Sequence, residues 1–234
     1  MNIVTPEAIT IMTTFKCTAE CEECCYQCSR NRNERLGIMT IKSYIKESRE
    51  VFHNLKAVYF TGGECFLLGN DLIEAISYAT SLKLLTRCVT NGYWGKDSKK
   101  AFDLAAKLKK AGLKEINFST GDNHQKFVPI DSVIEAAIAC ATNGIRTLII
   151  VEGSKDYAYK LEELRKDPKF LQYNETADNP IGTMKNVWIS LKDGKRVKQD
   201  KELYFQNKDF NELVGCENIF LNTGIDPNSR IVSC

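Results

Sequence analysis

The chain has 234 residues, of which 43% are hydrophobic and 26% are charged. This length supports one sizeable core with at most a small appendage. The 32 basic and 30 acidic side chains nearly balance, so the charge pattern predicts neither a nucleic-acid partner nor a membrane partner. The composition excludes collagen-like, coiled-coil and disordered classes, and the apolar runs are far shorter than the roughly 20 residues that cross a bilayer.

Cysteine usage is the unusual feature of the composition. Five of the ten cysteines crowd into twelve consecutive positions, namely Cys17, Cys21, Cys24, Cys25 and Cys28. Cysteines so close in sequence can rarely all pair with one another in unstrained disulfides. The start of the chain shows no secretory signal, so we expect a cytoplasmic protein with reduced thiols. In that compartment a cysteine cluster is more often metal-binding or catalytic.

Short β-type runs alternate with helical patterns along the first 165 residues. In chain order, we expect strands at 8–13, 57–60, 84–90, 115–119 and 146–151, separated by helices at 41–52, 71–82, 98–111, 130–142 and near 157–165. This alternation predicts βαβ units around a parallel sheet. Polar or glycine-containing segments follow each strand, and the carboxyl ends of parallel strands share one edge. We therefore expect the functional residues to converge there.

The alternation breaks after about residue 167. Residues 168–183 are polar and contain proline, which predicts a loop, and 187–191 is a candidate sixth strand. Residues 219–222 and 230–233 flank an Asp-Pro-Asn-Ser turn, which is typical of a hairpin. We expect an α/β core over residues 1–190 and a short C-terminal extension over 191–234 that contains the hairpin.

Cys17, Cys21 and Cys24 form a C-x3-C-x2-C triplet. Three thiolates on one short loop can hold three irons of a cubane 4Fe–4S cluster and leave the fourth iron open to a ligand. Zinc is the alternative, because Cys21 with Cys24 and Cys25 with Cys28 are both C-x2-C pairs. A structural zinc site usually takes a second ligand pair from further along the chain, and no such pair follows here. The pattern therefore favours iron and sulfide.

The triplet after the first strand, followed by Gly62-Gly63-Glu64 after the second, resembles the radical S-adenosylmethionine (radical SAM) superfamily. The resemblance covers roughly residues 8 to 190 and implies a partial (β/α)6 barrel. It implies that the open iron chelates the amino and carboxylate groups of SAM, with Gly62, Gly63 and Glu64 lying along the methionine moiety. It further implies an external one-electron reductant of the flavodoxin or ferredoxin type. Reduction then cleaves SAM to methionine and a 5′-deoxyadenosyl radical, which abstracts hydrogen from a substrate.

Two positions depart from the family pattern. Glu23 stands where an aromatic residue usually precedes the third cysteine, and Cys65 stands where proline usually follows Gly-Gly-Glu. A second register, Cys21 with Cys25 and Cys28, has the same spacing. We prefer the first register because Cys17 follows the strand by only a few residues and Thr14-x2-Cys17 is similar to the family's lead-in.

Other residues at strand ends are candidates for the SAM site. The Glu64 carboxylate can accept a charge-assisted hydrogen bond from a ligand ammonium group. Ser119 matches the position at which the family contacts the SAM ribose. Asn91 and Glu152 follow or end strands and are candidates to face SAM, while Asp122 has loop capping and a substrate or ribose contact as its two expected roles.

The tail suggests the substrate class. Residues 225–234 resemble the hairpin at which radical SAM peptide maturases begin an auxiliary-cluster domain of the SPASM or twitch type, and Cys216 and Cys234 flank it. A longer chain would then hold an auxiliary iron–sulfur cluster. We expect modification of a peptide or protein side chain, as by a maturase of ribosomally made peptides. The alternatives are a glycyl-radical-enzyme activase, a small-molecule radical SAM enzyme, or a non-catalytic zinc or iron–sulfur module.

Overall fold

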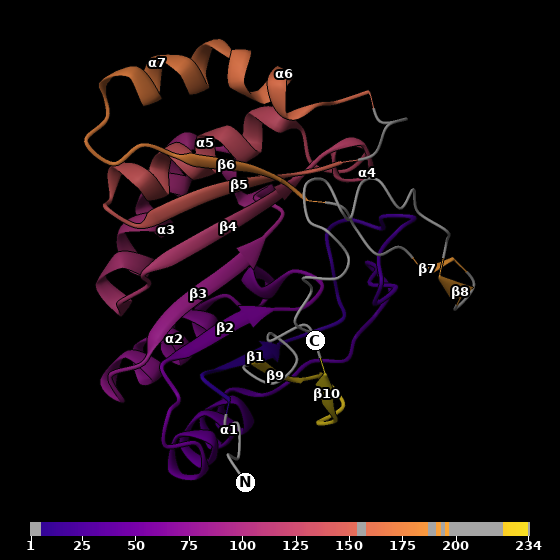
Figure 1. Ribbon diagram of the computed structural model, residues 1–234, viewed down its shortest axis with the longest axis vertical. Helices are drawn as coiled ribbons and strands as arrows, with labels where there is room; N and C mark the ends of the chain where they lie inside the picture. The colour runs from indigo at the N-terminus through magenta and orange to yellow at the C-terminus, as the bar shows by residue number, and fades with distance from the viewer. Residues whose placement is uncertain (1–5, 154–157, 187–190, 193–194, 197–221, 234) are drawn as a thin grey trace, which may run out of the picture.

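The central sheet has eight strands, of which six neighbouring parallel strands follow the order of the chain (Figure 1). The computed structural model describes residues 6–153, 158–186, 191–192, 195–196 and 222–233. The six strands are β1 (Ala8–Met12), β2 (Ala57–Thr61), β3 (Leu85–Thr90), β4 (Glu115–Thr120), β5 (Arg146–Glu152) and β6 (Gly182–Asn186). The expected α/β fold, a partial (β/α)6 barrel, is confirmed.

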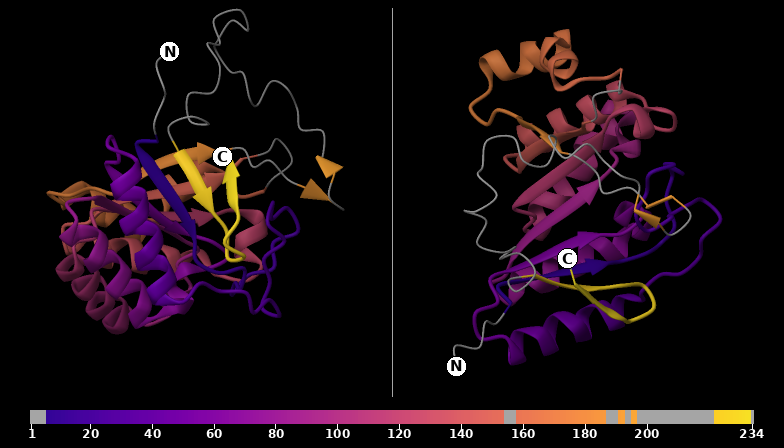
Figure 2. Two further views of the ribbon diagram at one scale, coloured as in Figure 1. Left: turned by 90° about the horizontal axis from the view of Figure 1, so that it is seen from below. Right: turned by 45° about the vertical axis from the view of Figure 1, so that its right-hand side comes forward.

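Helices connect successive strands and cover one face of the sheet (Figures 1 and 2). The longer ones are α1 (Ile38–Val51), α2 (Asn70–Ser81), α3 (Ser98–Ala111), α5 (Ile130–Thr142), α6 (Leu161–Lys166) and α7 (Pro168–Thr176). Short turns follow the second, third and fourth strands as η1 (Cys65–Leu68), η2 (Tyr93–Lys96) and α4 (Asp122–Gln125). Among the described helices, none combines the length and apolar character that crossing a membrane requires.

Successive side chains along each strand point to opposite faces of the sheet. Val58, Phe60, Ile116 and Phe118 point toward the helices and are fully buried in the main core. The intervening residues point to the opposite face, which we call the open face. This face is polar toward the carboxyl ends of β3, β4 and β5. The fold therefore separates an apolar packing face from a face suited to ligands.

The prediction of a loop over residues 168–183 is wrong, because this segment contains α7 and the start of β6. The Asp167 carboxylate caps α7 by accepting hydrogen bonds from the Lys169 and Phe170 backbone N–H groups, and Pro168 occupies the first turn. A capping Asp followed by Pro is a helix start signal. Phe170 packs in the core and stabilises α7, although the polar sequence of the segment does not indicate a helix.

Two further boundaries differ from expectation. The helix expected near 157–165 begins only at Leu161, because the Asp122 carboxylate accepts the backbone N–H groups of Ala158 and Tyr159 and holds them outside the helix. The sixth strand is β6 instead of residues 187–191. Of that range, 187–190 lies outside the described residues, and Leu191 begins β7 (Leu191–Lys192), which pairs with β8 (Lys195–Arg196).

The C-terminal hairpin is present as β9 (Asn222–Ile225) and β10 (Ile231–Ser233), which pair antiparallel. Of the first arm expected at 219–222, only Asn222 is among the described residues, and the strand continues to Ile225. It is joined to the main sheet, because β9 pairs in parallel with β1 (Figure 2). The Asp226 carboxylate closes the turn by accepting the backbone N–H groups of Asn228 and Arg230 at 2.9 Å each. Cys216, Cys234 and the expected auxiliary cluster lie outside the described residues.

Gly95 in η2 packs closely against α5, and substituting it tests this contact. A Cβ there would lie 1.9 Å from the Ser132 carbonyl oxygen and 2.9 Å from Ala136 Cβ, both on α5. We expect Gly95→Ala to lower the free energy of unfolding by about 1–3 kcal/mol through overpacking. Gly37→Ala is the matched control, since nothing lies within 4 Å of its Cβ position, and should change stability by less than about 0.5 kcal/mol. Urea unfolding measures both, and equal effects would contradict the packing described.

Candidate functional site

The cysteine segment, residues 13–36, leaves the carboxyl end of β1 and folds back on itself before α1 begins. The Phe15 N–H donates to the Glu34 carbonyl at 3.0 Å, and the Cys17 N–H donates to the Ser29 carbonyl at 3.0 Å. A small second core of Met12, Phe15, Cys17, Ala19 and Cys28 lies beneath the segment, with Cys21 and Cys24 packed against it. The predicted triplet is therefore gathered in one place at the edge where the parallel strands end.

Burial and hydrogen bonding shift the pKa values of the thiols in opposite directions. Burial, with a smaller contribution from neighbouring negative groups, raises the pKa of Cys17 and of Cys21 to about 12. A hydrogen bond from the Cys28 thiol lowers the pKa of Cys24 despite its burial. An iron–sulfur cluster or metal ion, when bound, would supply positive charge that deprotonates its thiol ligands.

The spacing of the thiols bears on which group they hold. Within the described residues, no three His, Cys, Asp or Glu side chains are grouped so that they could hold one metal ion. Cys17, Cys21 and Cys24 nevertheless provide three thiols on one short segment, which is the kind of donor set that binds a cubane, with each thiolate on a different iron atom. Cys25 is exposed and lies apart from the second core, whereas Cys28 is part of it.

The Gly62-Gly63-Glu64 segment packs directly on the start of the cysteine segment. The Gly63 N–H donates to the Thr14 carbonyl at 2.7 Å, and the Glu64 N–H donates to the Lys16 carbonyl at 2.9 Å. A Cβ on Gly63 would lie 2.2 Å from the Lys16 carbonyl oxygen, and one on Gly62 would lie 2.5 Å from that of Thr14. Close backbone approach thus requires glycine at both positions. The backbone in contact is the chain's own, one residue before Cys17.

The Glu64 carboxylate, which we expect to accept a hydrogen bond from a ligand ammonium, is engaged by donors of the chain itself. It is fully buried and accepts three hydrogen bonds, from the backbone N–H groups of Phe66 and Asn91 and from the Thr90 hydroxyl. Burial raises its pKa to about 7, against the effect of these three donors. Glu64 therefore ties the end of β2 to the end of β3 and caps η1.

Asn91 connects the end of β3 to the cysteine segment. Its side-chain amide donates to the Thr18 hydroxyl at 2.9 Å and approaches the Cys17 sulfur at 3.6 Å, while its backbone N–H holds Glu64. An amide donor aimed at a ligand sulfur stabilises negative charge on that sulfur and tunes a cluster's reduction potential. Asn91 is thus placed at the centre of the predicted site.

Strand register sets the remaining candidates along the open face. Val89 lies opposite Asn117, so Asn91 comes to the level of Ser119, which is half-buried and lies opposite Ile150. Glu152 follows two residues after Ile150 on the same face. The register therefore puts Asn91 and Ser119 at one level of neighbouring strands, and Glu152 lies two residues beyond that level on β5.

The two acidic candidates beyond β4 hold the chain's own backbone. The buried Glu152 carboxylate accepts the N–H groups of Asn123 at 2.6 Å and His124 at 3.2 Å, which fixes α4. Asp122 accepts the N–H groups of Ala158 and Tyr159 at 2.6 and 2.7 Å. Of the two roles expected for Asp122, the structure shows loop capping. Both carboxylates position the loops that surround the open face.

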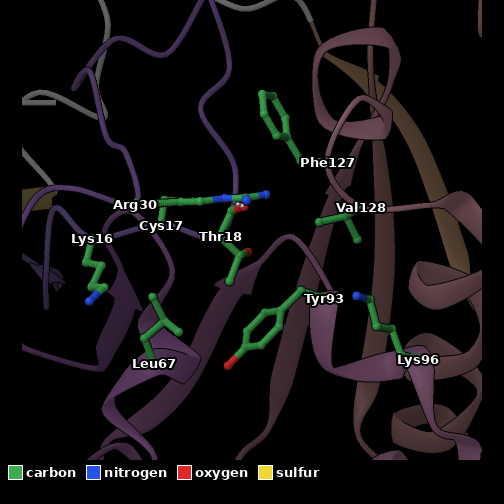
Figure 3. A pocket seen from close by; sticks show the side chains of 9 residues that line it. All are labelled: Lys16, Cys17, Thr18, Arg30, Leu67, Tyr93, Lys96, Phe127 and Val128. Atoms are coloured by element: carbon green, nitrogen blue, oxygen red, sulfur yellow. Dashed lines mark hydrogen bonds between the residues drawn. The ribbon is translucent and has the colours of Figure 1, made fainter.

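A surface cavity of about 370 Å³ lies beside the cysteine segment (Figure 3). Cys17 and Thr18 line it from that segment, Tyr93 from η2, and Phe127 and Val128 from the turn before α5. Sequence reasoning missed both this cavity and the linking role of Thr90. The Thr-Asn-Gly signal after the third strand marked the location, but no pattern indicates which partners a buried carboxylate meets.

The comparisons with known sequences give one relative. No protein-family model matches the chain. Over 130 residues it is 25% identical to YydG, a Bacillus subtilis (strain 168) protein named for peptide biosynthesis. The alignment covers 54% of this chain and 40% of that protein, so the matched part is less than half of the relative.

Several solved structures have a similar fold. The structure of BtrN in complex with AdoMet and 2-DOIA has a TM-score of 0.52 at 12% identity, covering 98% of this chain and 73% of BtrN. Methylornithine synthase (PylB) gives 0.53 at 16% identity, over 84% of this chain and 58% of PylB. The enzyme anSMEcpe with bound AdoMet and the Cp18Cys peptide gives 0.50 at 17% identity, over 77% and 51%. These likenesses show that the chain shares the fold of these proteins, two of which were solved with AdoMet bound.

Glu64 should make stability depend on pH. A carboxyl whose folded pKa is raised from 4.5 to about 7 stabilises the fold below its unfolded pKa, and this contribution disappears as the pH rises through the folded value. Between pH 5 and 8, the reduced apoprotein should therefore lose about 2–3 kcal/mol of stability through Glu64.

Glu64→Gln serves to isolate this contribution, because other carboxyls titrate equally in both proteins. Urea unfolding at the two pH values should show the wild type losing about 2–3 kcal/mol more than the variant. Parallel pH dependence in the two proteins would show that the Glu64 carboxyl keeps an ordinary pKa.

Proposed function

We propose that this chain is a radical SAM enzyme that holds a 4Fe–4S cluster on Cys17, Cys21 and Cys24 and modifies a peptide or protein side chain. The observation that carries the proposal is the gathering of three thiols at the carboxyl edge of a parallel sheet, with the Asn91 amide beside Cys17. When bound, the cluster supplies one electron that cleaves SAM and yields a radical able to abstract hydrogen. A reducing compartment such as the cytoplasm keeps the thiols available.

The candidate residues have two proposed roles, which are contact with SAM and support of the surrounding loops. Asn91 and Ser119 have side chains on the face where SAM would lie, so we assign them to cofactor contact. Gly62 and Gly63 let the backbone approach the segment that carries Cys17. We assign this backbone to contact with the methionine moiety of SAM. Three buried or capping carboxylates, at Glu64, Asp122 and Glu152, hold the surrounding loops in place through backbone N–H groups.

We further propose that the substrate is a peptide. The relative YydG is named for peptide biosynthesis, and anSMEcpe has been crystallised with peptides. The hairpin of β9 and β10, which extends the sheet on the β1 side, adds to this because its sequence resembles the hairpin at which peptide maturases begin an auxiliary-cluster domain. We propose that a longer chain continues from this hairpin into an auxiliary iron–sulfur domain. The chain needs an external one-electron donor whether or not an auxiliary domain is present.

Single cysteine variants test the cluster assignment. Cys17→Ala, Cys21→Ala and Cys24→Ala should each lose most of the iron and sulfide after anaerobic reconstitution, because each removes one ligand of a cluster that binds about four irons. The control is Cys25→Ala, whose thiol is exposed and outside the second core, and it should keep the full content. Loss of iron in Cys25→Ala and Cys28→Ala with retention in Cys17→Ala would instead establish the register of Cys21, Cys25 and Cys28.

Reductive cleavage of SAM tests the activity itself. The reconstituted chain with dithionite should convert SAM to 5′-deoxyadenosine and methionine, slowly without substrate, and liquid chromatography measures both products. Cofactors carry the difficult chemistry, and the protein positions them. The Cys25→Ala variant should retain this rate. A fully loaded cluster that produces no 5′-deoxyadenosine would refute the proposed function.

A further inference from the structure

Cys24 and Cys28 lie against each other in the cysteine segment. The Cys28 backbone N–H donates to the Cys24 sulfur at 3.5 Å, and the Cys28 thiol is hydrogen-bonded to the same sulfur. Cys24 is half-buried, whereas Cys28 is only 5% exposed and belongs to the second core. Cys24 is one of the three proposed cluster ligands, and the proposed function gives Cys28 no role. An accessible thiol and a buried thiol are therefore in contact beside the site.

A strained turn produces this contact. The Gln27 N–H donates to the Cys24 carbonyl at 3.0 Å, which closes a β-turn. Gln27 has φ +49°, a left-handed backbone conformation that non-glycine residues rarely adopt, and it leads the chain back so that Cys28 meets Cys24. Beyond the turn, the Cys17 N–H donates to the Ser29 carbonyl at 3.0 Å and fixes the returning chain. Strain of this kind persists where the surrounding structure holds it, and it clusters at functional sites.

Cys17 also belongs to the second core, but its hydrogen bonds direct its sulfur elsewhere. The Cys17 sulfur accepts the Ala19 backbone N–H at 3.4 Å and lies 3.6 Å from the Asn91 amide nitrogen. Cys17 is thus turned toward Asn91, and Cys28 is turned toward Cys24. The contacts therefore favour pairing of Cys28 with Cys24.

A second pair of thiols provides a contrast. The Cys65 thiol donates to the Val89 carbonyl at 3.3 Å and is hydrogen-bonded to Cys88. Both cysteines are fully buried in the main core, where reagents in solution do not reach them. Buried thiols of this kind are inert, whereas reactive thiols are at least partly exposed. Both pairs are in contact, and access to solvent distinguishes Cys24.

We propose that Cys24 and Cys28 are a redox-active dithiol that closes to a disulfide when no cluster is bound. Formation of the disulfide does not depend on the proposed function, but its consequence rests on it, because blocking Cys24 matters only if its thiolate binds the cluster. A closed disulfide removes one of the three ligands, so the cluster assembles only after a thiol reductant reopens it. A bound cluster in turn occupies Cys24 and prevents the reaction.

The oxidant is a small disulfide such as oxidised glutathione, and the reaction is thiol–disulfide exchange. The Cys24 thiolate attacks one sulfur of the oxidant, forms a mixed disulfide with it and releases one glutathione thiolate. Cys28 then gives up its proton and attacks the Cys24 sulfur, which breaks the mixed disulfide and releases the second glutathione. Two protein thiols are oxidised while one glutathione disulfide is reduced to two thiols. The accessible Cys24 suits the first attack, and the buried Cys28 suits the second.

Disulfide mapping of the full chain tests the pairing. The chain is freed of iron with a chelator, reduced, incubated anaerobically with oxidised glutathione, and then alkylated while unfolded. Trypsin releases residues 17–30 with all five clustered cysteines, and chymotrypsin then cleaves after Tyr26. A disulfide to Cys28 keeps the two fragments joined, and fragmentation in the mass spectrometer identifies the partner cysteine.

The expected result is a disulfide between Cys24 and Cys28, with Cys65 and Cys88 still reduced. Dithiothreitol should reopen it. A disulfide from Cys28 to another cysteine, free thiols at both positions, or glutathione that persists on Cys24 would each overturn the proposal.

Two serine variants separate the steps of the reaction. In Cys28→Ser the second attack is lost, so the mixed disulfide on Cys24 should last at least about tenfold longer than in the wild type. The matched control is Cys25→Ser, which removes an exposed thiol next to Cys24. Adjacent residues lie too close together for an unstrained disulfide, so this variant should form the Cys24–Cys28 disulfide within about twofold of the wild-type rate.

The bound cluster gives a readout that links the dithiol to the site. Cluster-loaded chain should form the disulfide at least about tenfold more slowly than chelated chain, because iron occupies Cys24. Equal rates in the two preparations would overturn the proposed switch. Loss of iron in Cys28→Ser after reconstitution with dithiothreitol would make Cys28 a ligand and overturn it as well. A Cys24–Cys28 disulfide in a chain that binds no cluster even when reduced would support the dithiol and refute the proposed function alone.

Discussion

Two backbone hydrogen bonds join the end of β2 to the start of the cysteine segment, from Gly63 to Thr14 and from Glu64 to Lys16. The strands leave no room for a side chain there, because a Cβ on Gly63 would overlap the Lys16 carbonyl. This contact fixes the backbone one residue before Cys17 relative to the sheet. The position of the first thiol, its approach to Asn91, and the cavity that it lines all follow from this contact.

Two buried carboxylates hold the other loops at the carboxyl ends of the strands. Glu64 links β2 to β3 through Thr90 and Asn91, and Glu152 links β5 to the turn after β4 through Asn123 and His124. Each carboxylate is almost completely buried and accepts backbone N–H groups that would otherwise lack partners. Burying a charge is costly, as the raised pKa of Glu64 shows. The fold accepts that cost where the loops must be held in one conformation beside the site.

The sequence predicted elements well where local signals were complete. The bounds of α3 match expectation because Asp97 caps its start and Gly112, at φ +101°, ends it. The segment 168–183 was misread because its polar composition hid a helix whose start signal, Asp167 with Pro168, was present. The pairing of β9 with β1 joins residues more than 200 positions apart, and no local pattern encodes such a contact. In the site, spacing predicted which cysteines gather, but the partners of Glu64 and Asp122 depend on loops that only the folded chain brings together.

The central claim is that three cysteines leave one iron of a cubane free to bind SAM. Mössbauer spectroscopy of the ⁵⁷Fe-reconstituted chain, recorded with and without SAM, tests it most directly. The account predicts that SAM changes the environment of one iron in about four, while the irons held by Cys17, Cys21 and Cys24 keep theirs. Four irons that are all insensitive to SAM, or a single iron bound by cysteines alone, would contradict it.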